Sequence, residues 1–469
     1  MQRLSARKTN QSLKNSIKDG AAASAMDGLT GVYTTPYALA LGAGNTEIGF
    51  LNSIPKLFTM IFQPFIGNYI ESKSRKNITR NLALLYRIVW IPILLIPFIF
   101  LKEKIFLLII LLTISQVAGS ISSTAWACWM GDIVPEKIRG RYFGKRNMII
   151  SSVSFFTTLI GGWILGLTNN ITGFSIIFFL AVLSGMVSIY YLGKIPDVIY
   201  KKPSHKGHEI SLHSYDFIKN FRRYRNFSTF TIHMALLGFA VNVASPFFVV
   251  YMLQNMKIGY EWFAVITAIE ILIAILSQRY WGKLSDRIGD RIVMTVCNIL
   301  IIFYPFFWLF AKNQYHLMLI GAFSGFAWSG FDLSSFNYLL DVTPPQKRPI
   351  YISNYKMIHG ISLFSGPMIG GFLAQAFSNV TFLWFSGLQI LFLLSFILRG
   401  VFSSYTLPRM KEARIKAREV LPIRYIFPKV VAVYPARGII HELQHIDYCL
   451  TCWEKEVREK LKGKMHEIF

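Results

Sequence analysis

Charged residues are scarce in this chain, and acidic ones most of all. Only 16% of the 469 residues are charged, with 24 aspartates and glutamates against 49 lysines and arginines, while 53% are hydrophobic. A soluble domain of this composition would expose large apolar patches to water. The scarcity of charge therefore argues against a soluble protein and favours a chain whose apolar surface faces lipid.

Cysteines are few, and a phosphate-binding loop is missing. The four cysteines provide no disulfide framework, since Cys128 and Cys297 lie in apolar segments and Cys449 and Cys452 lie near the C-terminus. The sequence holds no Gly-x-x-x-x-Gly-Lys-Ser/Thr motif, so ATP-driven pumping through that device is not supported. A cleavable leader is not expected either, because residues 1–19 are polar and basic and a full apolar span follows them.

Long apolar runs occupy most of the chain instead. Each run is about 20 residues or longer, which is the length of a helix that crosses a bilayer. The runs lie at approximately 18–41, 46–70, 81–101, 104–130, 143–167, 171–193, 227–253, 261–283, 291–311, 315–340, 351–377 and 381–404. They predict an all-α membrane protein with twelve transmembrane helices and both termini on the same side.

Basic residues are concentrated in alternate connections between these runs. The long connection at 194–226 is rich in lysine and arginine, as are the shorter ones at 73–80, 137–146, 283–291 and 347–348. The opposite connections offer only Lys102, Lys104, Lys257 and Lys312. The positive-inside rule predicts a multi-pass protein of the cell membrane with cytoplasmic basic loops and termini. The net charge of +25 then reflects topology and anionic lipid, and no nucleic-acid partner is needed to explain it.

The chain repeats itself at a separation of about 210 residues. Asp132-x-x-Pro135-x-x-x-Arg139-x-x-Tyr142 recurs as Asp341-x-x-Pro344-x-x-x-Arg348-x-x-Tyr351. The repeat predicts two pseudo-symmetric six-helix bundles at 20–193 and 227–404, with a polar segment at 1–19, a central loop at 194–226 and a tail at 405–469. Parallel halves with a site between them suit a carrier that opens to alternate sides of a membrane.

A short motif follows the eighth run and has a counterpart after the second. Gly282-x-x-x-Asp286-Arg287-x-Gly289-x-Arg291 is matched by Gly67-x-x-x-Glu71-x-x-x-Arg75-Lys76. Together with the twelve spans, this pair resembles the signature loop of the major facilitator superfamily. The resemblance implies that the acidic residue and its basic partners latch the cytoplasmic ends of neighbouring helices. The first copy departs from the pattern, with Glu71 for the usual Asp and Ser74 for the usual Gly.

The predicted latch combines both loop motifs with the ends of the repeated segment. Its members are Gly67, Glu71, Arg75, Gly282, Asp286, Arg287, Arg291, Asp132, Arg139, Asp341 and Arg348. A carboxylate near a helix N-terminus and an arginine gains from the helix dipole and from charge-assisted hydrogen bonds. The alternative is ordinary topogenic charge, which we favour for Lys76 and Lys283.

The eleventh run contains Gly366-Pro367-x-x-Gly370-Gly371. This resembles a glycine–proline motif that the drug antiporters of the superfamily carry in their fifth span. Small residues at this spacing let helices approach closely, so we interpret the motif as helix packing at the interface of the two halves.

Polar residues recur at helical spacing in the four spans that line the cavity of the resembled fold. The expected cavity residues are Asp27, Thr30, Thr34, Tyr37, Gln116, Ser120, Ser123, Asn242, Glu270, Trp328 and Asp332. Ionisable groups at membrane depth are costly, so four residues need a partner or a function: Lys56, Asp27, Glu270 and Asp332. Asp27 or Glu270 is a candidate proton-coupling acid, and the alternative is a structural ion pair or an acid that reaches water. Arg87, Arg279 and Arg399 are expected to extend to the interface.

The C-terminal tail contains His441-Glu442-Leu443-Gln444-His445, followed by Cys449 and Cys452, in a predicted amphipathic helix. Two histidines four residues apart can share a zinc ion, and thiolates can add ligands. His441 and Cys452 would lie roughly 16 Å apart on a straight helix, which argues against one ion binding all four residues. Proteolysis is disfavoured because no protease domain surrounds the motif.

The sequence thus predicts a secondary active transporter of a small solute rather than an enzyme, working by alternating access without a resident cofactor. The expected partners are the lipid bilayer, a small-molecule substrate and a coupling proton. The alternatives are an uncoupled uniporter and a non-transporting membrane sensor with the same fold.

Overall fold

The computed structural model describes residues 6–72, 74–98, 103–135, 138–168, 171–197, 225–343, 348–380 and 384–411, and its regular elements are helices. The first half contains α1 (Ala6–Thr30), α2 (Thr34–Ala40), α3 (Asn45–Ser72), α4 (Arg75–Ile88), α5 (Trp90–Leu95), the 3-10 turn η1 (Ile96–Phe98), α6 (Lys104–Ile133), α7 (Arg139–Thr168) and α8 (Ile171–Gly193). The second half contains α10 (Arg225–Val250), the π-helical turn η4 (Tyr251–Asn255), α11 (Tyr260–Ile288), α12 (Asp290–Trp308), α13 (Gln314–Asp341), α14 (Arg348–Ala376), α15 (Gly387–Thr406) and the 3-10 turn η6 (Leu407–Arg409).

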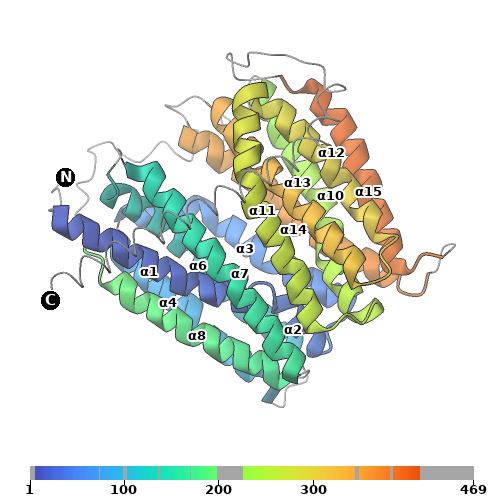
Figure 1. The fold of residues 1–469 in the computed structure, drawn as a ribbon, viewed down its shortest axis with the longest axis horizontal. Helices are drawn as coiled ribbons and strands as arrows, with labels where there is room; N and C mark the ends of the chain where they lie inside the picture. The colour runs from blue at the N-terminus through green and yellow to red at the C-terminus, as the bar shows by residue number, and fades with distance from the viewer. Residues whose placement is uncertain are drawn as a thin grey trace, which may run out of the picture.

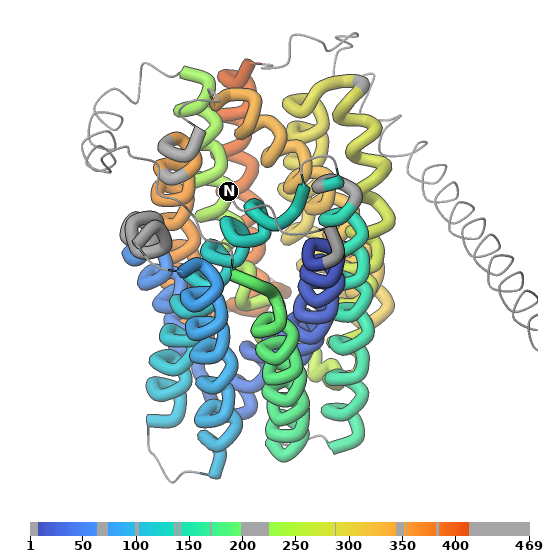
Figure 2. The backbone as a smooth tube through the Cα atoms, turned by 90° about the vertical axis from the view of Figure 1, so that its left-hand side faces the viewer, coloured from blue at the N-terminus to red at the C-terminus, as the bar shows by residue number. Residues whose placement is uncertain are grey.

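These helices confirm the all-α membrane fold. Ten stretches in the described part of the chain are long and apolar enough to cross a membrane. The pair α1 and α2 and the single helix α3 complete the expected twelve spans. They are more polar than the others because they carry charged residues at depth, among them Asp27 and Lys56. In Figure 2 the helices of both halves run along a common direction, as in a bundle that crosses a bilayer.

Local sequence signals set several helix boundaries. The side chain of Ser74 accepts a hydrogen bond from the third residue beyond it and caps α4, and Asn313 caps α13 in the same way. Ser386 and Gln389 form a capping box at the start of α15. Gly289 joins α11 to α12 with a φ of 93°, a conformation that a glycine adopts without strain.

The helices form two groups that meet along two pairs. In the first half α1 packs on α7 and α8, and α6 packs on α3 and α4; in the second half α13 packs on α11 and α12, and α10 packs on α14 and α15. Between the halves, α3 packs on α14 and α7 packs on α11. Figure 1 shows the blue-to-green helices on one side and the yellow-to-orange helices on the other, with α7 beside α11.

The buried apolar residues show where the halves join. One large core cluster contains residues of both halves, including Tyr33, Leu165, Val243 and Phe263. These residues lie toward the membrane face opposite the basic loops. Near the basic loops each half has clusters of its own: one around Trp129 and a small one around Ile78 in the first half, and one in the second half. The two halves therefore share a core at one face and have their own cores at the other.

Small residues allow close approach at the shared face. A β-carbon placed on Gly49 of α3 would lie 2.7 Å from the carbonyl oxygen of Pro367 and 2.9 Å from the Cα of Gly371, both in α14. A β-carbon on Gly162 of α7 would lie 2.0 Å from the β-carbon of Ala264 in α11. The glycines of the Gly366–Gly371 motif thus take part in the packing between halves and against α10, as in other membrane helix interfaces.

Candidate functional site

A cavity of about 740 Å³ lies between the two halves. Its wall is formed mainly by α1, α3, α4, α6 and α7, and α14 of the second half supplies the opposite side. The wall includes Thr79, near the start of α4, and Leu192, beside the end of α8. Both lie next to basic connections, so the cavity opens toward the basic-loop face. We call this space the central cavity.

A smaller chamber of about 380 Å³ lies deeper and mostly within the second half. Residues of α10, α11, α12, α13 and α15 line it, together with Gly31 and Thr35 from the break between α1 and α2. Lys56 of α3 lines both the chamber and the central cavity. The Nζ of Lys56 donates a hydrogen bond of 3.4 Å to Oδ1 of Asn242 in α10. Lys56 therefore stands where the two spaces and the two halves meet.

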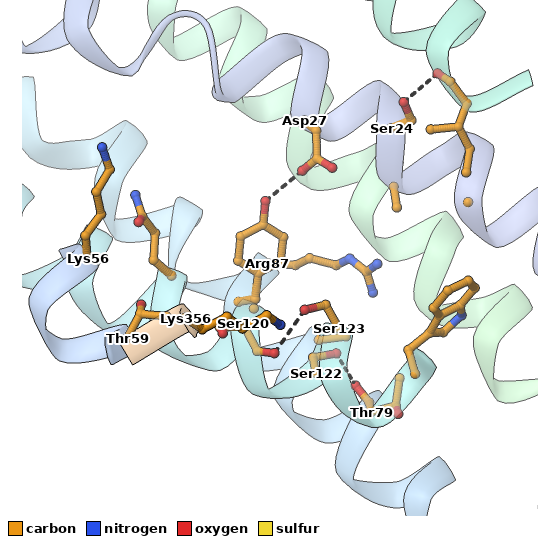
Figure 3. Close-up of a pocket in the computed structure, with 18 of the residues that line it drawn as sticks. Ser24, Asp27, Lys56, Thr59, Thr79, Arg87, Ser120, Ser122, Ser123 and Lys356 are labelled. Atoms are coloured by element: carbon orange, nitrogen blue, oxygen red, sulfur yellow. Dashed lines mark hydrogen bonds between the residues drawn. The ribbon is translucent and has the colours of Figure 1, made fainter. Parts of the chain in front are cut away.

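Asp27 projects into the central cavity from α1, as Figure 3 shows. Its carboxylate accepts a hydrogen bond of 2.8 Å from the hydroxyl of Tyr86 in α4. Among the residues described, no basic nitrogen lies within 4 Å of this carboxylate. Asp27 is thus a carboxylate at membrane depth that faces the cavity and is held by a neutral donor.

A charged cluster lies one to two turns away, at the junction of α1, α4 and α8. The guanidinium of Arg87 lies 4.0 Å from Asp19 and donates a 2.7 Å hydrogen bond to Ser188, which in turn donates to Asp19. Arg87 is 5% exposed and Asp19 is 4% exposed. This buried cluster ties three helices of the first half together beside the cavity.

The chamber has its own acid and its own base. The carboxylate of Glu270 in α11 accepts a 2.7 Å hydrogen bond from Ser324 in α13. Arg399 of α15 is 1% exposed and donates hydrogen bonds to Ser395 (3.1 Å) and to the carbonyl oxygen of Ile301 (2.8 Å). Within the described ranges no carboxylate lies within 4 Å of the Arg399 guanidinium.

The expected cavity residues divide into three groups. Asp27, Gln116, Ser120 and Ser123 line the central cavity. Asn242, Glu270 and Trp328 line the chamber.

The remaining expected cavity residues lie away from both spaces. Tyr37 is fully buried, donates to the carbonyl oxygen of Ile93 and packs on Phe174. Thr30 and Thr34 donate to carbonyl oxygens of their own helical turn, and Asp332 is an exposed residue of α13.

Two of the expected latch residues contact each other. Arg75, at the start of α4, forms an ion pair with Asp132, near the end of α6. In the second half the carboxylate of Asp290, fully buried at the start of α12, accepts hydrogen bonds from Ser285 and from Asn337 (3.1 Å). Sequence reasoning missed Asp290, although its place at a helix N-terminus was a usable signal.

The other latch residues are placed as follows. Asp286 and Asp341 are exposed, Arg291 lies in the first turn of α12, and Gly282 faces Leu333 of α13. The side chains of Glu71, Arg139, Arg287 and Arg348, and the surroundings of Gly67, lie outside what the structure describes. The candidate metal ligands His441, His445, Cys449 and Cys452 and the predicted amphipathic helix also lie outside the described residues.

The expectation for two arginines was wrong. Arg87 and Arg399 do not extend to the interface but are buried among helices. Arg87 donates a hydrogen bond to Ser188, and Arg399 donates to Ser395 and to the carbonyl oxygen of Ile301. Lys356 and His359 of α14 were also missed, and both line the central cavity. Their position in an apolar run was the signal that could have identified them.

Comparisons with known proteins agree with this architecture. The model of the Major Facilitator Superfamily matches residues 20–276 and 234–440. The multidrug resistance protein MdtG of Klebsiella pneumoniae is 26% identical over 193 residues, which make up 39% of this chain and 45% of that protein. An uncharacterised MFS-type transporter of Schizosaccharomyces pombe is 30% identical over 105 residues, or 22% of this chain and 17% of that protein. The matches therefore span less than half the length of these relatives.

Solved structures share the fold over most of the chain. The nucleoside transporter NupG, solved as a single-site variant, has a TM-score of 0.68 at 14% identity and covers 85% of this chain and 100% of its own. A bacterial homologue of the iron transporter ferroportin, in an inward-facing state, has a TM-score of 0.65 at 12% identity, with coverages of 87% and 99%. An inward-facing, unoccupied bacterial homologue of the lysosomal transporter Spinster has the same TM-score at 12% identity, with coverages of 87% and 98%. The chain belongs to the Major Facilitator Superfamily and is a multi-pass membrane protein.

Proposed function

We propose that this protein is a secondary carrier that moves a small solute by alternating access. The observation that carries the proposal is the central cavity, which opens at the basic-loop face while the opposite face is sealed. A carrier of this kind needs a site between two halves and a seal that can form on either side of it. The separate apolar cores near the basic loops leave that end free to open.

The seal consists of close contacts between α3 and α14 that leave no room for larger side chains. Gly49 and Gly371 touch backbone to backbone, and the side-chain amide of Asn45 donates a hydrogen bond of 3.3 Å to the carbonyl oxygen of Ala374. Packed interfaces of this kind have discrete arrangements rather than continuous ones. Opening the sealed face would therefore require the halves to rock as bodies and to close at the basic-loop end.

The basic loops lie on the cytoplasmic side of the cell membrane in this proposal, together with both termini. The lysine and arginine bias between the two sets of loops supports that orientation. The arrangement described is then the inward-open state. A cysteine at Ser120, in the cavity wall, should react with a membrane-impermeant thiol reagent from the cytoplasmic side in inside-out vesicles.

Protons are the proposed coupling ion, and Asp27 is the proposed coupling acid. Asp27 faces the cavity, has a neutral hydrogen-bond donor and lacks a basic partner within 4 Å among the residues described. A carboxylate at membrane depth is a candidate for proton transfer because its charge is costly there. Glu270 is the second candidate, since it lines the chamber and is held by Ser324.

Flux through the purified protein in liposomes tests the proposal. Ligands would first be chosen by thermal shift against sugars, amino acids, organic anions and cationic dyes. Uptake driven by an imposed pH gradient and abolished by a protonophore is the expected result. Uptake that ignores the protonophore indicates a uniporter, and ligand binding without any flux indicates a sensor.

A further inference from the structure

We propose that the transported solute carries a negatively charged group, a carboxylate or a phosphate, and that Lys56 binds it at the junction of the central cavity and the chamber. This inference rests on the proposed carrier function and names the class of its substrate. It begins with the balance of charge in the two spaces.

Basic side chains outnumber acidic ones around the central cavity. Its charged wall consists of Asp19, Asp27, Lys56, Arg87, Arg146 and Lys356. Asp19 is engaged by Arg87 and Ser188, and Asp27 by Tyr86. The other three cations have no carboxylate within 4 Å in the described part of the chain. The cavity therefore presents a positive potential to a ligand that enters from the open face.

The chamber repeats this imbalance. Its charged side chains are Lys56, Glu270 and Arg399. Among the residues described, Arg399 makes hydrogen bonds only to neutral groups, and no carboxylate lies within 4 Å of its guanidinium. A cation kept at membrane depth without a counter-charge is unfavourable unless a ligand or water supplies one. The second space thus adds to the positive field at the junction instead of cancelling it.

Lys56 is the cation best placed to contact the ligand itself. It lines both spaces, and its hydrogen bond of 3.4 Å goes to Asn242, which is a neutral amide. Figure 3 shows Lys56 extending along the cavity wall from α3. An ammonium group on a flexible stem can exchange a long hydrogen bond to an amide for a short, charge-assisted one to an anion.

The same contact links binding to the motion of the halves. Lys56 belongs to α3 of the first half, whereas Asn242 and His359 belong to α10 and α14 of the second half. An anion held at Lys56 would lie against groups of both halves, with His359 in the same cavity wall. Its departure would remove this contact between the halves, so the loaded and empty carriers would differ in how easily the halves approach.

A charge-matched ligand panel tests the inference on the full-length protein in detergent. The panel pairs fluorescein with rhodamine 6G, benzoate with benzylamine, and glucose 6-phosphate with glucosamine. We expect anionic members to raise the unfolding temperature and to bind more weakly as salt is added. Lys56→Gln should weaken anion binding by about tenfold or more, because a hydrogen bond to a charged group is lost.

Lys312→Gln is the control, since it removes an equal charge from an exposed connection on the sealed face. Binding of cationic members alone, no binding of any anionic member, or anion binding unchanged by Lys56→Gln would each overturn the inference. The measurement is repeated in phosphatidylcholine nanodiscs with and without phosphatidylglycerol. If phosphatidylglycerol competes with the anionic ligands and the competition requires Lys56, the site binds a lipid headgroup, and the inference that it binds a solute is overturned.

These outcomes are distinct from failure of the carrier proposal. Flux of a cationic solute would retain the carrier and reject the anion. Selective anion binding at Lys56 without flux would retain the site and reject transport.

Discussion

Gly49 of α3 and Gly371 of α14 pack backbone to backbone, with room for no side chain between them. A β-carbon on Gly49 would lie 2.9 Å from the Cα of Gly371, and the neighbouring atom is backbone that cannot rotate away. The contact lies at the sealed face, where the cores of the two halves merge. Closure of the sealed face in this inward-open state thus depends on the absence of a side chain at one position in each half.

Gly49→Val should therefore bias the carrier away from this state. The added methyl groups would force α3 and α14 apart at the sealed face, so a cysteine at Ser120 should gain reactivity from the outer side. Thiol labelling of right-side-out vesicles measures this. Gly144→Val is a matched control, because a β-carbon on Gly144 meets nothing within 4 Å among the residues described. Equal outer labelling of Gly49→Val and the parent would count against the seal.

The ion pair between Arg75 and Asp132 should stabilise the first half. Both side chains are mostly buried, at 13% and 14% exposure, so either single neutralisation breaks the pair and leaves the other charge mostly buried. We expect Arg75→Gln and Asp132→Asn each to lower the unfolding temperature. The double mutant should lose less than the sum, with a coupling of about 0.5–3 kcal/mol. Strict additivity would mean that the two residues do not interact in the folded protein.

Arg87→Met should be more damaging still. It would leave the Asp19 carboxylate buried with only Ser188 as a hydrogen-bond donor among the residues described, at a cost of about 3–5 kcal/mol. Adding Asp19→Asn should recover much of that loss, since no uncompensated charge then remains. Thermal unfolding of the detergent-solubilised variants measures both effects. A double mutant no more stable than Arg87→Met would contradict the pairing.

Asp27→Asn should separate transport from the proton gradient. The amide cannot take up a proton in the working pH range, so a pH gradient should no longer drive accumulation, while exchange of labelled for unlabelled solute continues. Tyr86→Phe is the control, because it removes the 2.8 Å hydrogen bond and leaves the acid. If gradient-driven uptake survives in Asp27→Asn and disappears in Glu270→Gln, the coupling role moves to Glu270.

The sequence predicted the fold because bilayer physics leaves strong marks on it. The signals that predict the fold can be recognised in short stretches of sequence. They are the apolar runs of span length, the loops with many basic residues, such as 194–226, and the repeated segments at Asp132 and Asp341. The same patterns singled out Asp27, Gln116 and Glu270, which line the central cavity and the chamber. Each of these stands out as a polar residue within an apolar stretch.

The partners of buried polar groups could not be predicted in this way. Helical spacing placed Tyr37 on the cavity side, but its hydroxyl meets the carbonyl oxygen of Ile93 in the core. Arg399 was expected at the interface because the sequence does not show which acceptors lie near it in the bundle. Its guanidinium donates hydrogen bonds to Ser395 and to the carbonyl oxygen of Ile301. Such pairings depend on how helices far apart in sequence rotate against each other.

Distances across the two faces, measured by double electron–electron resonance, test the central claim most directly. In a background free of native cysteines, one spin-labelled pair at Glu47 and Gln375 reports on the sealed face, and a second pair at Lys145 and Lys283 reports on the basic-loop face. Alternating access predicts that a change of pH or ligand lengthens the first distance as it shortens the second. Distances that stay fixed under all conditions, or that lengthen together, would contradict it.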